Sequence, residues 1–265
     1  MALLRDMTLG QYIPGESFVH RLDPRTKIIV TMLLIILLFL IDTFQGYGLV
    51  ALFIGGLILL ARLSPRFVLR GIRPMLVIIL FTLVLHVFLS QGEVIGQLGP
   101  LKVTREGLVK GGMMVTRLLL LIIGASLLTL TTSPIALTDG IEAILSPGKR
   151  FGLPAHELAM MMTIALRFIP TLLEEMDKIT KAQMARGADF ETGNIVQRAR
   201  SLLPLLVPLF VSAFRRADEL AVAMEARCYR GGEGRTKMKQ LFFTWRDYTV
   251  IGLTLAFAVI VGGLL

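Results

Sequence analysis

The sequence has a single cysteine, Cys228, and only three histidines among its 265 residues. One thiol excludes an intrachain disulfide framework and a cysteine-based metal site. The histidines and carboxylates show no spacing typical of metal ligands, so we expect no metal. The chain also lacks the phosphate-binding pattern G-x-x-x-x-G-K-[ST] and the hydrolase patterns G-x-S-x-G and H-E-x-x-H. We therefore expect no enzymatic activity and no cofactor held by this chain.

Acidic residues are scarce as well, since 19 Asp and Glu accompany 28 Lys and Arg, for a net charge of +9. Apolar residues are abundant: 54% of the chain is hydrophobic and the mean hydropathy is +0.72. An ordinary globular domain contains roughly 45–50% apolar residues. The basic residues are dispersed and lack interleaved aromatics, which argues for anionic lipid and against nucleic acid as their partner. The composition predicts an all-α integral membrane protein.

Apolar runs predict five membrane spans, at about 28–41, 47–63, 74–90, 111–130 and 248–265. The first is short for a hydrocarbon core of about 30 Å, so we expect Thr26 and Phe44 to extend it. The polar first 27 residues show no cleavable signal peptide. We predict a tail (1–27), a membrane domain with spans one to four (28–132), a polar helical domain (133–245) and a last span (246–265).

Positive charge sets the expected orientation. Residues 133–247 hold sixteen of the 28 Lys and Arg, whereas the predicted outer loop, 91–110, holds three. A second inner loop carries Arg62, Arg66, Arg70 and Arg73. Because inner loops are enriched in Lys and Arg, we expect the N-terminus in the cytoplasm and the C-terminus outside.

Two further apolar stretches, near 158–173 and 202–214, are interpreted as helices that do not span the membrane. The first contains Arg167 and Pro170 and leads into a charged run, and the second is about thirteen residues long, which is too short to cross. We expect long amphipathic helices along the cytoplasmic side, bent by Pro170, Pro204 and Pro208.

Each of these helices is predicted to end in a small residue followed by arginine. The apolar stripes advance by alternating steps of three and four. They comprise Ala165, Ile169, Leu172, Met176, Ile179, Gln183 and Arg186 in one helix, and Val196, Ala199, Leu203, Leu206, Phe210, Ala213, Ala217, Leu220, Met224 and Arg227 in the other. Two matched guanidinium tips suggest a pair of plugs for sockets on another protein. The alternative is two ordinary surface charges near helix C-termini, where the dipole favours cations.

His86 and Arg117 are the polar residues deepest in the predicted spans. Such residues are often functional, but both also lie near span ends, where Arg117 can reach outward. No carboxylate lies deep in a span, which argues against a proton relay.

Three motifs in order resemble a known family, the transmembrane T component of energy-coupling factor (ECF) transporters. His20-Arg21-Leu22-Asp23-Pro24-Arg25-Thr26-Lys27 resembles its N-terminal signature. Ala182-Gln183-Met184-Ala185-Arg186-Gly187 and Ala223-Met224-Glu225-Ala226-Arg227 with Tyr229-Arg230-Gly231 resemble its two Ala-Arg-Gly motifs. Cys228 stands where the second motif usually has glycine, so a positive φ there would be strained.

The resemblance implies about five transmembrane helices and three amphipathic coupling helices, the last two long, kinked and crossing. Their tips (Ala185, Arg186, Gly187, Ala226, Arg227 and Cys228) would dock into two cytoplasmic ABC-type ATPases, which would bind ATP and Mg. An apolar face (Met161, Ala165, Ile169, Leu206 and Phe210) would hold a small substrate-binding membrane protein, the S component. ATP-driven motion would thus power uptake of vitamins or other micronutrients across the bacterial cell membrane.

Three alternatives stay open. A dedicated nickel or cobalt permease subunit is the nearest, and the sequence does not separate a dedicated from a shared coupler. A stand-alone secondary transporter belongs to another class and needs a polar path through the spans. A membrane-embedded enzyme has no acid, base or metal constellation in its favour.

Overall fold

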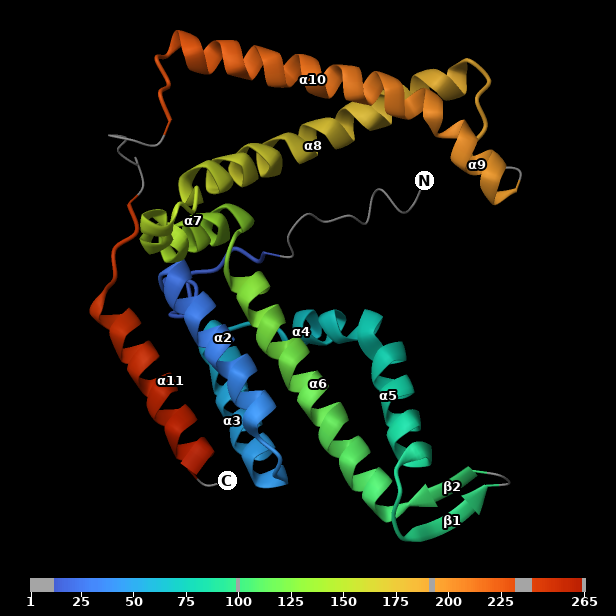
Figure 1. Ribbon diagram of the computed structural model, residues 1–265, viewed down its shortest axis with the longest axis vertical. Coiled ribbons are helices and arrows are strands. Elements are labelled where there is room, and N and C mark those ends of the chain that lie inside the picture. Colours follow the sequence, from blue (N-terminus) through green and yellow to red (C-terminus); the bar gives the residue numbers. More distant parts are fainter. Residues whose placement is uncertain (1–11, 99–100, 191–193, 232–239, 264–265) are drawn as a thin grey trace. The chain divides into compact units, whose positions relative to one another are not determined.

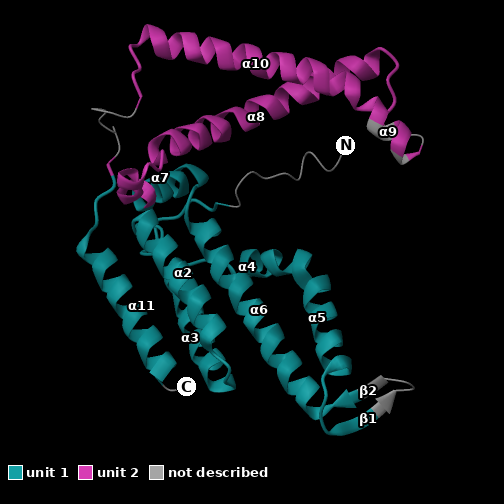
Figure 2. Cartoon of the chain, viewed as in Figure 1, with its two compact units in different colours: residues 1–144, 241–265 teal, residues 145–240 magenta. Residues whose placement is uncertain are grey.

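The computed structural model describes residues 12–98, 101–190, 194–231 and 240–263, and these are mainly helical (Figure 1). The chain divides into two compact units (Figure 2). Unit 1 comprises residues 1–144 and 241–265, and unit 2 comprises 145–240. The expected all-α architecture is confirmed.

Unit 1 is a bundle of apolar helices. Its elements are α2 (Pro24–Leu40), α3 (Phe44–Ala61), α4 (Pro65–Ile72), a 3₁₀ turn (Arg73–Met75), α5 (Leu76–Leu89), α6 (Arg105–Thr131), α7 (Pro134–Leu145, ending at the unit boundary) and α11 (Trp245–Gly263). Side chains at N-cap positions start four of them, because each accepts a backbone N–H that has no partner inside its helix. These caps are Asp23 for α2, Thr43 for α3, Thr104 for α6 and Ser133 for α7.

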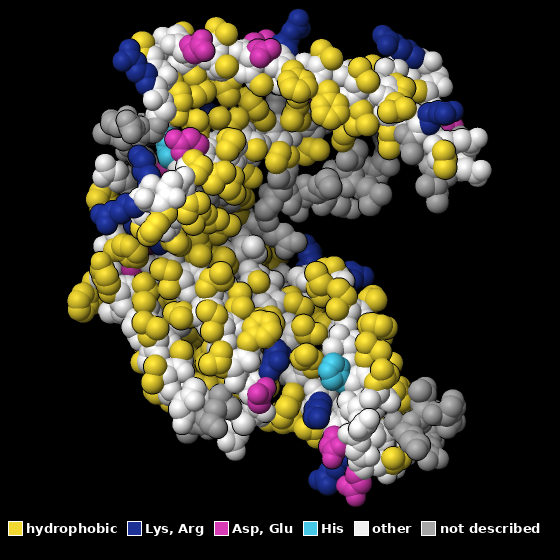
Figure 3. All heavy atoms as spheres, in the orientation of Figure 1, with side chains coloured by type: hydrophobic (Ala, Val, Ile, Leu, Met, Phe, Trp, Pro, Cys, Tyr) yellow, Lys and Arg dark blue, Asp and Glu magenta, His cyan; other side chains and the backbone are white. Residues whose placement is uncertain are grey.

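The core of unit 1 lies between α2, α3, α6 and α11. Leu38, Ile41 and Val50 are almost fully buried there, and Phe53 stacks on Phe257 with ring centroids 4.6 Å apart. The outward side chains are apolar as well, and Figure 3 shows hydrophobic groups across the visible face of these helices. A bundle that is apolar inside and outside suits a lipid environment.

Among the described residues, five helices have the length and composition of a membrane span: Phe44–Ala61, Pro65–Leu89, Arg105–Thr131, Ala155–Ala185 and Trp245–Gly263. Four of them contain predicted spans. The predicted first span lies in α2, whose 17 residues extend about 25 Å. The remaining candidate is α8 (Ala155–Ala185), which the sequence pattern places along the membrane surface; its length and composition alone also fit a membrane span.

Two boundaries correct the sequence-based prediction. Thr26 does extend the first helix, but Phe44 begins α3, because Ile41 is already extended and Thr43 caps the next helix. The predicted outer loop is more ordered than expected, with an antiparallel hairpin of β1 (Val94–Leu98) and β2 (Leu101–Thr104). The helix-breaking Gly99-Pro100 pair lies outside the described residues.

Unit 2 is built on two long helices, α8 (Ala155–Ala185) and α10 (Leu203–Ala226), which pack together and cross (Figure 1). A 3₁₀ segment (Ser146–Phe151) precedes α8, and α9 (Ile195–Ser201) precedes α10. The continuous stripe predicted from Val196 to Arg227 is wrong at this point, because the helix breaks at Leu202. Pro204 explains the break: it has no N–H to donate and occupies the first turn of α10. Pro170 and Pro208 lie inside α8 and α10.

Candidate functional site

The tip of α8 is a Schellman turn, the helix ending in which a left-handed residue follows the C-cap. Arg186 is the C-cap, and Gly187 follows at φ 88°. The N–H of Gly187 donates to the carbonyl of Met184, and that of Ala188 donates to the carbonyl of Gln183, both at 3.0 Å. These bonds satisfy carbonyls that the helix end leaves open. The backbone therefore holds the exposed Arg186 at the end of the rod.

The tip of α10 repeats this geometry. Arg227 is the C-cap, the N–H of Cys228 donates to Glu225 at 2.8 Å, and that of Tyr229 donates to Met224 at 3.0 Å. Cys228 has φ 57°, so the condition under which the sequence predicts strain at this position is met. A residue with a Cβ in this region is less stable than glycine by about 1–2 kcal/mol. The turn thus tolerates strain at Cys228 to keep the shape seen at Gly187.

An ion pair lies midway between the two tips. Nη2 of Arg216 on α10 is 3.1 Å from Oε2 of Glu175 on α8. Arg186 follows Glu175 by 186 − 175 = 11 residues, and Arg227 follows Arg216 by 227 − 216 = 11. Because the helices run in opposite directions (Figure 1), the two tips lie at opposite ends of the crossed pair, at most roughly 33 Å apart at 1.5 Å per residue.

The predicted stripe of α10 matches its less exposed face in the second half of the helix, where Leu220 and Met224 are half-buried, but not near the helix start. Leu205 is buried, whereas Leu203 and Leu206 of the stripe are exposed. The helices cross at an angle, so their contact is shorter than a coiled-coil seam and leaves part of the stripe uncovered. The side chain of Ala199 lies outside the described residues.

An apolar face therefore stays open on unit 2, and hydrophobic side chains follow both long helices in Figure 3. The predicted residues lie on it to different degrees: Met161 is 56% and Phe210 59% exposed, Ala165 and Leu206 are exposed, and Ile169 is half-buried. Val207, Val211 and Phe214 extend this face. A patch of this kind marks an interaction surface for another apolar body.

Where the long helices diverge, they enclose a cavity of about 700 Å³. Met160, Ile164 and Phe168 of α8 face Leu220 and Met224 of α10 across it. Arg167, Arg227, Cys228 and Arg230 line the same cavity, so the second tip stands beside a cleft with both apolar and cationic side chains.

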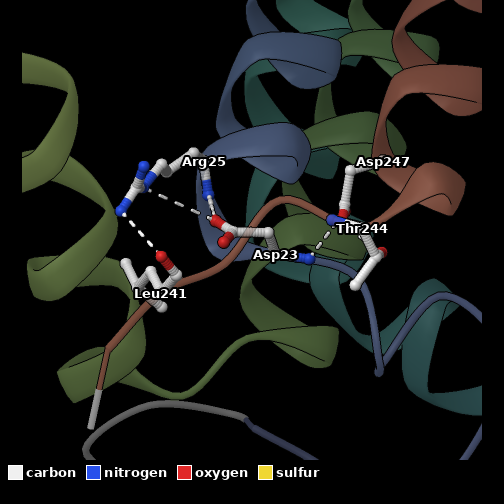
Figure 4. A network of polar contacts seen from close by, with 5 residues as sticks. All are labelled: Asp23, Arg25, Leu241, Thr244 and Asp247. Atoms are coloured by element: carbon white, nitrogen blue, oxygen red, sulfur yellow. Dashed lines mark hydrogen bonds and ion pairs between the residues drawn. The ribbon is translucent and has the colours of Figure 1, made fainter.

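The signature segment before α2 forms a polar cluster that sequence analysis did not anticipate (Figure 4). Asp247, at the start of α11, is 1% exposed and accepts the N–H of Asp23 at 2.9 Å and the N–H of Thr244 at 2.8 Å. Arg25 Nη2 donates to the carbonyl of Leu241 at 3.5 Å. These bonds join the first and last helices of unit 1. A carboxylate at the start of an apolar span was the available signal, because a buried charge requires partners.

Two more signature residues anchor this end of unit 1. Lys27 Nζ donates to the carbonyls of His20 at 3.1 Å and Thr131 at 2.9 Å, which links α2 to the end of α6. The His20 ring bonds to Ser17 Oγ at 2.6 Å and the Ile13 carbonyl at 3.1 Å. Burial lowers the pKa of His20 below its ordinary value, and the nearby Lys27 charge acts in the same direction. The segment is thus packed against the bundle and not a free tail.

His86 and Arg117 have structural partners. Arg117 donates from Nε to the Tyr47 hydroxyl at 2.8 Å and from Nη2 to Asp42 at 3.0 Å, at the turn between α2 and α3. His86 Nδ1 lies 2.9 Å from the carbonyl of Thr82, one turn earlier on α5. In the described part of the chain, no group of three or more His, Cys, Asp or Glu could hold a metal ion.

Comparison with known proteins agrees with the motifs. The family described as "Cobalt transport protein" (CbiQ) matches residues 15–238. The chain is 64% identical over 244 residues to the energy-coupling factor transporter transmembrane protein EcfT of Thermosediminibacter oceani, covering 92% of each chain. It is 57% identical over 255 residues to EcfT of Ruminiclostridium cellulolyticum (96% of each) and 52% identical over 250 residues to EcfT of Bacillus subtilis (94% of each).

These relatives are transporter subunits that match nearly the whole chain, and the helices of unit 1 supply the apolar spans that such a subunit requires. The chain is therefore a multi-pass membrane protein, and it belongs to the family of transmembrane components of energy-coupling factor transporters.

Proposed function

We propose that this chain is the mechanical coupler of an ECF importer: it passes ATP-driven motion of two cytoplasmic ATPases to a membrane-embedded S component. The observation that carries the proposal is the pair of matched tips. Arg186 and Arg227 end two Schellman turns of the same geometry, and each lies eleven residues beyond the Glu175–Arg216 ion pair. Two matched tips at opposite ends of the crossed pair suit two similar binding pockets on a partner.

Arginine is well matched to such a socket. Its guanidinium stays charged at all relevant pH values and presents several donors in a fixed plane to a carboxylate or to backbone carbonyls. Ala185 and Ala226, the residues before the arginines, are exposed and small, so a partner can approach the helix end closely. ATP and Mg would be bound by the ATPases, and unit 2 would lie in the cytoplasm.

The experiment is co-purification of the ATPases with the full-length chain from membranes. Arg186→Ala with Arg227→Ala should abolish recovery, because removing one partner of a buried charged contact typically costs ~2–5 kcal/mol, a loss of affinity of about thirtyfold or more. Arg215→Ala is the matched control, since Arg215 is exposed on α10 away from both tips. Wild-type recovery of the ATPases with the double variant would reject the docking role.

The S component would occupy the open apolar face of unit 2. Phe210 and Met161 stand on different helices, so one partner covering both would sense a change in their crossing angle. Phe210→Asp should release the S component and leave the ATPases bound. Glu174→Gln serves as the control and should retain both, because Glu174 is exposed and lies about 180° around α8 from Ala165.

The cargo is proposed to be a vitamin or another micronutrient. A cobalt or nickel cargo is the second candidate, because the matching family is described as a cobalt transport protein. Relatives that are 52–64% identical carry the general ECF name without a cargo. Identifying the S component that co-purifies from native membranes decides between the two.

A further inference from the structure

Helix α4 carries a row of arginines that the coupling function does not use. It lies between two apolar helices, α3 and α5, and Figure 1 shows it turned away from the axis of α5. Covalent continuity with both spans keeps α4 close to a membrane surface, on whichever side that end of the bundle faces. The helix is short, eight residues, and strongly two-sided.

One side of α4 is fixed to the bundle. Val68 and Ile72 are buried, and Val68 packs in a cluster with Ala61 and Leu130. Gly71 lies so close to α6 that an added Cβ would be 2.9 Å from Ser126 Oγ. The helix is therefore held in one position before any ligand arrives.

The opposite side of α4 is cationic. Arg66 and Arg70 are four residues apart and share a face, and at about 100° per residue that face lies about 200° from Val68 and Ile72. Arg73 continues the row. These three arginines are exposed, and so is Arg62, the C-cap of α3, whose backbone is in the left-handed conformation. None of them takes part in an ion pair in the described part of the chain.

Apolar side chains flank the row. Phe67 and Leu69 are 42% and 61% exposed and lie about 60–100° to either side of Arg66 and Arg70. The Arg70 guanidinium carbon is 5.7 Å from the centroid of the Phe67 ring. Cations framed by exposed apolar groups are typical of helices that lie at the level of lipid headgroups.

We propose that Arg62, Arg66, Arg70 and Arg73 form a preformed site for the phosphate of an anionic phospholipid headgroup. The guanidiniums bind the phosphate oxygens, which they can do in pairs, while Phe67 and Leu69 contact the first part of the acyl chains. An acidic protein surface is the less favoured occupant, because it gives the exposed Phe67 and Leu69 no apolar neighbour. The site would anchor this end of the bundle in the lipid, independently of how unit 2 works.

The test uses the full-length chain reconstituted in phosphatidylcholine vesicles with spin-labelled phosphatidylglycerol or spin-labelled phosphatidylcholine. The measured quantity is the preference of the motionally restricted lipid shell around the protein for phosphatidylglycerol over phosphatidylcholine. Wild type should prefer phosphatidylglycerol. Arg66→Gln with Arg70→Gln should lower the preference at least fivefold, since each basic residue near a charged surface contributes about a fivefold change in affinity.

Three comparisons make the result specific. Arg66→Lys with Arg70→Lys keeps the charge and should retain most of the preference. Lys178→Gln with Lys181→Gln removes the same charge from a part of α8 where Lys181 is already paired with Asp177, and should leave the preference unchanged. Added inorganic phosphate should not compete at concentrations equal to the lipid.

The proposal is overturned if wild type shows no preference, or if the α8 and α4 variants lose it equally. Competition by free phosphate would overturn the lipid assignment in favour of a soluble anion. Loss of a co-purifying protein in the α4 glutamine variant, with unchanged lipid selectivity, would identify an acidic protein partner instead. Because the exchanged arginines are exposed, all variants should fold, which thermal unfolding in detergent checks.

Discussion

The two arginine tips share a backbone turn but differ in the residue that occupies its left-handed position, which gives a sharp prediction. Gly187 (φ 88°) suits the turn, whereas Cys228 (φ 57°) is strained in it. Exchanging the residue types should move the two tips in opposite directions. Cys228→Gly should tighten the end of α10, and Gly187→Ala should loosen the end of α8.

The magnitude follows from two opposing terms. Removing Cβ from a left-handed residue stabilises the closed turn by about 1–2 kcal/mol. The greater backbone freedom of glycine stabilises the opened state by about 0.5–1 kcal/mol and offsets part of this. The net gain at Cys228→Gly is about 0.5–1 kcal/mol, or about two- to fivefold in the local opening equilibrium. A Cβ at Gly187 would meet no atom within 4 Å, so Gly187→Ala should lose a similar amount through the backbone alone.

Hydrogen exchange followed by mass spectrometry measures both effects. The reporting amides are those of Tyr229 and Ala188, which donate to the helix carbonyls five residues earlier. Cys228→Gly should slow exchange at Tyr229 and leave Ala188 unchanged; Gly187→Ala should speed exchange at Ala188 only. Faster exchange at Tyr229 in Cys228→Gly would refute the strain argument, since it would mean that the thiol side chain stabilises the turn.

Three further predictions concern unit 1. Asp247→Ala should lower stability by about 3–5 kcal/mol in detergent unfolding, since it strands the buried N–H donors that its carboxylate binds, Thr244 N–H among them; a loss under 1 kcal/mol would contradict this. Arg117→Ala should destabilise by about 1–3 kcal/mol and Asp42→Ala by about 0–1 kcal/mol, because Asp42 is 86% exposed; equal losses would contradict this. Because burial lowers the pKa of His20, the folded state favours its neutral form, so stability should fall as the pH drops below about 6.5; His20→Asn should remove that slope.

Much of the fold could be predicted from local sequence patterns. Apolar runs located helices α2, α3, α5, α6 and α11, since a span is a local property of about twenty residues. The small-residue-plus-arginine pattern located both helix ends. The sequence also indicated that Cys228 would be strained if its φ were positive, and its φ is 57°. These features depend on residues next to one another in the chain.

Features that depend on distant residues were not predictable in the same way. The hydrogen bond from Asp23 N–H to the Asp247 carboxylate joins residues 224 positions apart. The local sequence around either residue does not indicate that they are in contact. Near the start of α10 the buried residue, Leu205, differs by one position from the periodic stripe, because burial there depends on how the two helices cross. Pro204 predicts either a bend within one helix or the start of a new helix. The sequence does not distinguish the two, so the break at Leu202 was predicted only as a bend.

The most direct measurement of the coupling account uses the native thiol. Cys228 is the only cysteine of the chain and is exposed at the tip of α10. Its rate of labelling by a membrane-impermeant maleimide is compared in the intact complex and after the ATPases are stripped away, with Ala185→Cys reporting on the other tip. The account predicts that both thiols are protected in the complex and react from the same side of the membrane once the ATPases are gone. Equal labelling in both states, or reaction of the two tips from opposite sides, would contradict it.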